Sequence, residues 1–277
     1  MKRRVLPFLI ILLCVPMLMG AWGKPRKKAA KPKAEAAAQA TLNQAPRAGV
    51  GNADGSPDMT SPGEYGNIVL NRYTGDGKSA RAVVFPHWWH RTQYTCKACH
   101  IDLGIKLEAG AADMKMADID SGKFCGKCHN GEAAFATTAS CDRCHSQGIE
   151  VPENRKFESI THDFPKDCCG NRVNWVKALD EGNIAPKPSV NGTGEMMIAD
   201  FIVERPIKDG IIPNVLYPHK PHTQVLACDN CHPSIFTPKA GKTPITMTKI
   251  NAGNYCGVCH GKVAFPIEDC FRCHSKR

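Results

Sequence analysis

The residues with the clearest chemistry are pairs of cysteines that are separated by two residues and followed directly by a histidine. This pattern occurs six times and uses twelve of the fifteen cysteines in the 277-residue chain. Two thiols at this spacing can add across the vinyl groups of a haem, and the adjoining histidine then reaches the iron from one face of the ring. The predicted attachment residues are Cys96, Cys99, Cys125, Cys128, Cys141, Cys144, Cys228, Cys231, Cys256, Cys259, Cys270 and Cys273. The predicted proximal iron ligands are His100, His129, His145, His232, His260 and His274.

Paired cysteines also occur in zinc sites and in redox-active disulfides. Neither kind of site requires a histidine directly after the second cysteine, whereas all six copies carry one. We therefore predict six covalently bound haem c groups, with their iron, as the cofactors.

The six motifs fall into two blocks with one layout. In the first block, His87 and His90 precede three motifs, and in the second block His219 and His222 do the same. The first histidine of each pair stands nine positions before the first haem cysteine, and it follows an aromatic residue and a proline in both blocks. Agreement at these fixed offsets indicates a duplicated three-haem module.

Blocks of this size bury little apolar surface of their own. We expect small, loop-dominated modules whose core is mostly haem, with short α-helices near the motifs. A minor β-hairpin is expected from residues 68–70 and 83–85. Because haem binding and folding are coupled, the modules should not fold stably without the haems.

Each block resembles the triheme domain of the cytochrome c7 family, a relative of the cytochrome c3-like multihaem c-type cytochromes. The resemblance covers roughly residues 64–150 and 200–277, and the His-x-x-His pair is its most specific part. It implies that the first histidine of each pair is the distal ligand of the first haem, and that the second ligates the second haem. The implied axial pairs are His87 with His100, His90 with His129, His219 with His232, and His222 with His260.

The third haem of each module departs from the family. The family usually takes its distal ligand from a histidine shortly before the second motif, and neither block has one there. Met116 and Met247 occupy matching positions, each nine residues before the second motif, so they are candidates to ligate opposite His145 and His274. Methionine acting as core filler is the alternative. His162 is another candidate ligand for the first module, or a surface residue.

The number of axial ligands separates electron transfer from catalysis. If both methionines bind, all axial positions are filled, and the protein carries electrons between redox protein donors and acceptors without being an enzyme. If they do not bind, a five-coordinate third haem could serve a multihaem reductase, which is the alternative function. The resemblance implies a place in anaerobic or extracellular-metal respiration.

Two segments precede the first module. A basic start, an apolar run over residues 5–19 and small residues near Gly23 predict a signal peptide at residues 1–23, which would remove Cys14. An uncleaved membrane anchor is the alternative. Residues 24–63 are basic and then rich in Ala, Pro and Gly, which predicts a disordered tether that is either solvated or in contact with a membrane or an acidic partner. We therefore expect the periplasm as the location, with the outer-membrane surface or extracellular space as alternatives.

The formal net charge of +10 gives no argument for nucleic-acid binding. Three of these charges would leave with the signal peptide, and the haem propionates add negative charge to the folded body. We therefore expect no nucleic-acid partner.

Residues 151–199 form the predicted linker between the modules. Residues 173–182 predict a short helix that ends at Gly182, and we expect its apolar face to pack against a haem edge or the neighbouring module. Cys168 and Cys169 are adjacent, a geometry poorly suited to a bond between them. Inert thiols and an intermolecular disulfide are the interpretations that remain.

Overall fold

A computed structural model describes residues 61–75, 77–149, 151, 153–208 and 211–276. The predicted signal peptide, Cys14 and most of the predicted tether lie outside these residues. The last residues of the predicted tether, Ser61 to Gly63, belong to a turn in which the backbone N–H groups of Glu64 and Tyr65 donate to Ser61 O. Within the described ranges, no helix has both the length and the apolar character to cross a membrane.

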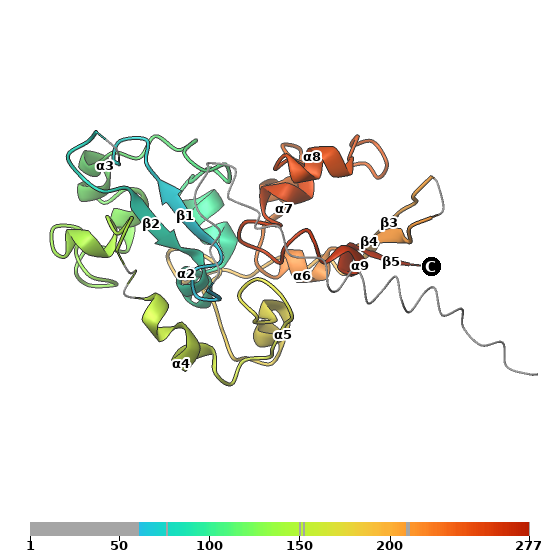
Figure 1. Cartoon of the computed structure of the whole chain (residues 1–277), viewed down its shortest axis with the longest axis horizontal. Coiled ribbons are helices and arrows are strands. Elements are labelled where there is room, and N and C mark those ends of the chain that lie inside the picture. The colour runs from blue at the N-terminus through green and yellow to red at the C-terminus, as the bar shows by residue number, and fades with distance from the viewer. Residues whose placement is uncertain (1–60, 76, 150, 152, 209–210, 277) are drawn as a thin grey trace, which may run out of the picture. The chain divides into compact units, whose positions relative to one another are not determined.

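The first half of the described chain combines one hairpin with short helices (Figure 1). Strands β1 (Asn67–Leu70) and β2 (Val83–Pro86) pair antiparallel, which confirms the predicted hairpin. Helix α2 (His87–Gln93) follows β2 directly, because Pro86 at its N-cap is extended and cannot donate a backbone hydrogen bond to the sheet. The other helical segments are η1 (Ala98–Asp102), α3 (Met116–Asp120), η2 (Phe124–Lys127) and η3 (Cys141–Arg143).

The second half repeats this order. Strands β3 (Ile202–Arg205) and β4 (Asn214–Pro218) form the matching hairpin, and β5 (His274–Lys276) adds to the free edge of β4. The helical segments that follow β4 are α6 (Lys220–Thr223), α7 (Cys228–Cys231), α8 (Met247–Asn251), η5 (Tyr255–Val258) and α9 (Cys270–Cys273).

The linker contributes η4 (Asn154–Lys156), α4 (Phe157–Thr161) and α5 (Trp175–Asp180). Helix α5 is the helix that the sequence predicts. The Asn174 side chain caps it by accepting from the backbone N–H of Lys177 at 3.0 Å. Gly182 lies just beyond its end at φ +76°, a conformation that glycine adopts without a steric penalty.

The main apolar cluster lies where the linker meets the first module. Trp88, Phe157 and Val173 are buried, and the Trp88 and Phe157 rings meet edge to face with centroids 5.0 Å apart. Few other large apolar side chains in the described residues are fully buried. The predicted fold class, small loop-dominated modules with short helices and minor antiparallel sheets, is confirmed.

Candidate functional site

A cavity of about 2440 Å³ runs through the described part of the chain. It is larger than the roughly 300–1,000 Å³ of a pocket for one small molecule. Every motif cysteine except Cys228 lines this cavity, together with ten of the eleven histidines. Thiols and imidazoles around a space of this size fit several large planar groups, as the haem-attachment motifs require.

The backbone orients nearly all of the cavity histidines. In nine of the ten, Nδ1 lies within hydrogen-bond distance of a backbone carbonyl oxygen. The carbonyl partners are Gly66 for His87, Pro86 for His90, Ile105 for His100, Phe135 for His129, Arg81 for His145, Pro218 for His222, Phe236 for His232, Phe265 for His260 and Pro213 for His274, at 2.6–3.3 Å. A carbonyl only accepts, so Nδ1 must carry the proton, and Nε2 keeps its lone pair for iron.

His219 is the exception among the cavity histidines. Its buried Nδ1 has no hydrogen-bond partner in the described residues, and its ring stacks on Phe201 with centroids 3.9 Å apart. The stacking holds the ring in place without fixing which nitrogen carries the proton.

Burial keeps several of these imidazoles neutral. Desolvation lowers the pKa of His87 to about 3, with smaller contributions from the charges of Arg91 and His100. Desolvation, followed by the neighbouring His222, lowers the pKa of His260 to about 4. Neutral imidazole is the form that binds a metal, so the fold prepares these side chains for ligation.

The two histidines implied as ligands of each second haem face one another at the same separation in both modules. The ring centroids of His90 and His129 are 6.3 Å apart, and those of His222 and His260 are 6.2 Å apart. Two imidazoles on opposite sides of one metal ion, each with Nε2 at about 2 Å, have centroids about 6 Å apart. The observed separations therefore fit an iron between each pair.

An aromatic residue two positions before each His-x-x-His pair holds both histidines. The Phe85 ring meets His87 edge to face at 4.7 Å and stacks on His90 at 4.2 Å. Tyr217 does the same in the second module, at 4.8 Å and 4.5 Å from the corresponding rings. One side chain thus sets the spacing of the implied distal ligands of two haems.

The two candidate methionines occupy equivalent places. Met116 and Met247 are the first residues of α3 and α8, each is 47% exposed, and both line the cavity. Met114 also lines it, so position on the cavity does not single out Met116. Methionine ligation of iron stays a prediction.

His162 lies apart from these residues. Its side chain is 81% exposed, its Nδ1 is 2.7 Å from an Asp163 oxygen, and it does not line the cavity. This position favours the surface interpretation over a role as a ligand.

Two arginines beside the haem motifs were not predicted from the motif spacing. In the first module, the Arg143 guanidinium lies 3.8 Å from the Phe135 ring centroid and pairs with Glu153 of the linker. Phe135 also accepts from His129, so Arg143 covers the residue that orients a proximal histidine. The available signal was arginine at the same position of both third motifs.

Arg272 repeats the arrangement in the second module. Its guanidinium lies 4.5 Å from the Phe265 ring centroid and pairs with Asp167, another linker carboxylate. Phe265 accepts from His260 as Phe135 does from His129. One linker therefore supplies a carboxylate to the third motif of each module.

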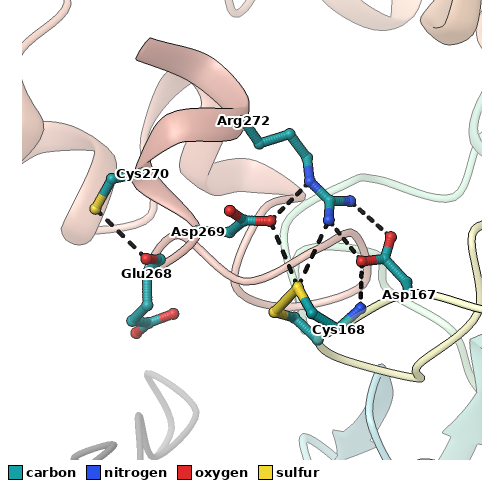
Figure 2. Close-up of a disulfide and its surroundings, with 7 residues drawn as sticks. Asp167, Cys168, Glu268, Asp269, Cys270 and Arg272 are labelled. Carbon is teal, nitrogen blue, oxygen red and sulfur yellow. Dashed lines mark hydrogen bonds and ion pairs between the residues drawn. A yellow bond between two sulfur atoms is a disulfide. The ribbon is translucent and has the colours of Figure 1, made fainter. Parts of the chain in front are cut away.

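Cys168 and Cys169 form a disulfide with each other (Figure 2). The expectation that adjacent cysteines would stay unbonded was wrong. Cys168 Sγ lies 3.8 Å from an Asp269 carboxylate oxygen and 3.9 Å from Arg272 Nη2. The disulfide thus touches the residues that flank the last motif.

Several contacts join the two halves. The Tyr65 hydroxyl donates to Ala264 O at 2.6 Å, and the Arg91 guanidinium donates to Val263 O. Segment η1 of the first half contacts α7 of the second, so the first motifs of the two modules meet. Trp175, on the apolar face of α5, packs against the cluster that contains Trp88 of the first module, and Asp180 of α5 accepts from Gln224 of the second module at 2.6 Å.

Fold and site together define a protein built to hold haem on repeated Cys-x-x-Cys-His motifs. The family model described as cytochrome c7 and related cytochrome c matches the chain twice, over residues 83–146 and 215–275. The chain belongs to this family. It is a multihaem c-type cytochrome that binds haem c covalently, which implies electron transfer.

Among solved structures, the chain is similar to a c7-type three-heme cytochrome domain, with 36% identity over 29% of this chain and 91% of that chain and a TM-score of 0.26. It is also similar to the C-terminal hexaheme fragment of GSU1996, with 25% identity over 76% of this chain and 97% of that chain and a TM-score of 0.26. The N-terminal hexaheme fragment of GSU1996 is similar too, with 24% identity over 76% of this chain and 99% of that chain and a TM-score of 0.25. No curated protein gives a significant match.

Proposed function

We propose that the chain holds six haem c groups in two triads and passes electrons between redox proteins, with no substrate chemistry of its own. One observation carries the proposal: ten histidines and eleven motif cysteines line a single cavity. When bound, the haems supply one-electron chemistry. The chain's own residues hold each iron and limit access to it.

The proposed distal ligands are His87, His90, His219 and His222, with Met116 and Met247 for the third haems. The backbone carbonyl bonds on most of these histidines support this assignment, because they leave Nε2 free. An iron with both axial positions filled changes oxidation state with little change in its surroundings, which suits transfer and excludes a substrate.

The joint between the halves supports electron flow from one module to the other. Segments η1 and α7 contact each other, and each contains the second cysteine of a first motif. We propose that electrons cross at this joint, between the first motifs of the two modules.

The haem count and the ligand sets test the proposal together. The mass of the purified holoprotein should exceed that of the mature chain by six haem groups. Magnetic resonance should resolve four bis-histidine sites and two histidine–methionine sites, and the reduced protein should not bind carbon monoxide. Carbon monoxide binding without displacement of a ligand would instead support the reductase alternative.

The methionine ligands have a separate test. Methionine raises haem potential relative to histidine, so Met116→His should lower the potential of one haem and remove half of the near-red sulfur-to-iron absorption band. Met114→Leu is the matched control, because Met114 lines the same cavity two residues away and should leave both properties unchanged. An unaltered titration in Met116→His would reject methionine ligation in the first module.

We also propose export to the periplasm, with the outer surface as the alternative, and a role in anaerobic or extracellular-metal respiration. The basic start and the apolar run of residues 5–19 support export, and the basic residues of the tether suit contact with anionic lipid or an acidic partner. Cell fractionation with N-terminal sequencing should find the mature protein outside the cytoplasm, beginning at Lys24. A cytoplasmic, uncleaved holoprotein would contradict this proposal.

A further inference from the structure

The guanidinium of Arg272 contacts Asp167, Asp269 and the sulfur of Cys168 (Figure 2). Nη1 and Nη2 donate to the two carboxylate oxygens of Asp167 at 2.8 Å and 2.6 Å, and Nε lies 2.8 Å from an Asp269 oxygen. The Phe265 ring covers the remaining side. The Asp167 side chain is only 9% exposed, and the Arg272 hydrogen bonds hold the pKa of its carboxyl below the ordinary value. Asp167 therefore stays charged and neutralises Arg272 close to the haem motifs.

The Cys168–Cys169 disulfide fixes the peptide that supports Asp167. The Asp167 Oδ1 atom accepts from the backbone N–H of Cys168 at 2.7 Å. The sulfur of Cys168 touches both Arg272 and Asp269, and the Cys168 residue is exposed. The disulfide is thus open to solvent on one side and in contact with Arg272 and Asp269 on the other.

We propose that Cys168 and Cys169 form a thiol–disulfide exchange site for a dithiol, and that Asp167 and Arg272 transmit the state of this disulfide to the second module. One thiolate of the dithiol attacks a sulfur of the pair, so that a mixed disulfide forms while the Cys168–Cys169 bond breaks. The second thiolate then attacks the mixed disulfide. The dithiol is oxidised to a disulfide. The two electrons and two protons that it loses reduce the Cys168–Cys169 disulfide to two thiols.

Opening the disulfide should raise the potential of a neighbouring haem. The peptide at Cys168 becomes free to move, so Asp167 loses the support of its backbone donor. Arg272 stays in place, because Asp269 holds it from the same segment, three residues away. Its positive charge is then less neutralised beside Phe265 and His260, which favours the reduced form of the haem.

The first module provides an internal control. Arg143 pairs with Glu153 over Phe135 in the same way, and no cysteine stands within five residues of Glu153 on its C-terminal side. A dithiol should therefore leave the haems of the first module unchanged.

Alkylation tests the exchange site without reference to haem ligation. The native holoprotein is treated with dithiothreitol, labelled with N-ethylmaleimide and analysed by peptide mass spectrometry. Two labels are expected, both on the peptide that contains Cys168 and Cys169, and none without dithiothreitol. Labelling that requires denaturation, or that occurs without dithiothreitol, would overturn the exchange site.

A redox titration of the labelled protein tests whether the state of the disulfide reaches a haem of the second module. The measured potentials rest on the proposed haem function, whereas the number of labels does not. The reduction potential of one haem of the second module, assigned by NMR, should rise. At a fixed applied potential its oxidised-to-reduced ratio should change about threefold, which corresponds to roughly half of the 59 mV that a tenfold change requires. The double variant Cys168→Ser/Cys169→Ser should give the same shift without dithiothreitol. Asp167→Asn should also raise this potential and abolish the response, whereas Glu153→Gln should raise a first-module potential regardless of dithiothreitol.

A labelled wild-type protein whose titration is unchanged would overturn the transmission, even if Asp167→Asn shifts the potential. The wild-type measurement decides this point if the double serine variant fails to fold. An equal shift in both modules would also overturn it, because only the second module has the disulfide.

Discussion

At the scale of single residues, the backbone fixes which nitrogen carries the proton in most of the cavity histidines. Nine of the ten cavity histidines have a carbonyl oxygen at Nδ1, for example Gly66 O at 2.9 Å from His87. A carbonyl cannot change its protonation state, so the tautomer of these rings is insensitive to pH. Ligand orientation is therefore fixed by how the loops fold around each motif.

His162→Gln is expected to leave the absorption spectrum and all haem potentials unchanged, because His162 is exposed and does not line the cavity. The comparison variant is His90→Gln, which should remove a ligand from one haem and create a site that binds carbon monoxide. Optical titrations of the two variants under the same conditions make the measurement. A potential shift in His162→Gln would reinstate this residue as a ligand.

At the scale of elements, the segment before each second motif is packed against it at a glycine. A Cβ on Gly126 would lie 1.8 Å from the carbonyl oxygen of Ile119 in α3, and a Cβ on Gly257 would lie 1.9 Å from that of Ile250 in α8. The helices that begin with Met116 and Met247 therefore lie directly on the peptide between the second motif's cysteines. This contact fixes where each methionine can reach.

Gly126→Ala and Gly257→Ala are each expected to lower the free energy of unfolding by about 3 kcal/mol, because backbone must move to admit the methyl group. Gly110→Ala is the control, since its Cβ meets nothing within 4 Å and only its φ of +73° is unfavourable, at about 1 kcal/mol. Chemical denaturation of the three holoproteins gives the values. Equal losses in all three would contradict the close packing.

At the scale of the whole molecule, the linker does more than connect the modules. It supplies Glu153 and Asp167 to the third motifs, forms the main apolar cluster with Trp88, and carries α5 to the second module. The two modules are thus tied to one shared element and to each other.

Tyr65→Phe is expected to lower the free energy of unfolding by about 1–2 kcal/mol, because the hydroxyl that bridges to Ala264 is lost and a partly buried carbonyl is left unpaired. Burial, the largest cause, raises the pKa of Tyr65, so the hydroxyl remains a donor at any pH of interest. Tyr73→Phe is the control, because Tyr73 is 45% exposed and its partner Asp113 is on the surface. Its loss should stay within about 0.5 kcal/mol in the same denaturation experiment.

Replacement of all twelve motif cysteines by serine should give a chain without stable tertiary structure, because few large apolar side chains of the described residues are buried by the protein itself. Circular dichroism and NMR should show no cooperative thermal transition and no dispersed amide signals. A cooperative transition in this haem-free chain would mean that the protein core, and not the haem, determines the fold.

Local patterns allowed the sequence to predict the motifs, the hairpin at residues 68–70 and 83–85, and helix α5. Each depends on residues close together in the chain, where spacing and turn residues are informative. The Arg272–Asp167 pair joins residues 105 positions apart, and β5 joins the C-terminal end to β4. No local periodicity encodes such pairings, which is why the contacts of Arg272 were missed. The Cys168–Cys169 bond was missed because a general geometric expectation was applied to a turn whose conformation was unknown.

The linker carboxylates bear on how such a chain can be lengthened or shortened by duplication. The first module takes its counter-charge from Glu153, downstream of its last motif, and the second takes Asp167 from upstream of its first strand. A module copied without the adjoining linker would keep an arginine over its phenylalanine but lose the linker carboxylate that pairs with that arginine. Each copy keeps that pairing only if the linker is duplicated with the module.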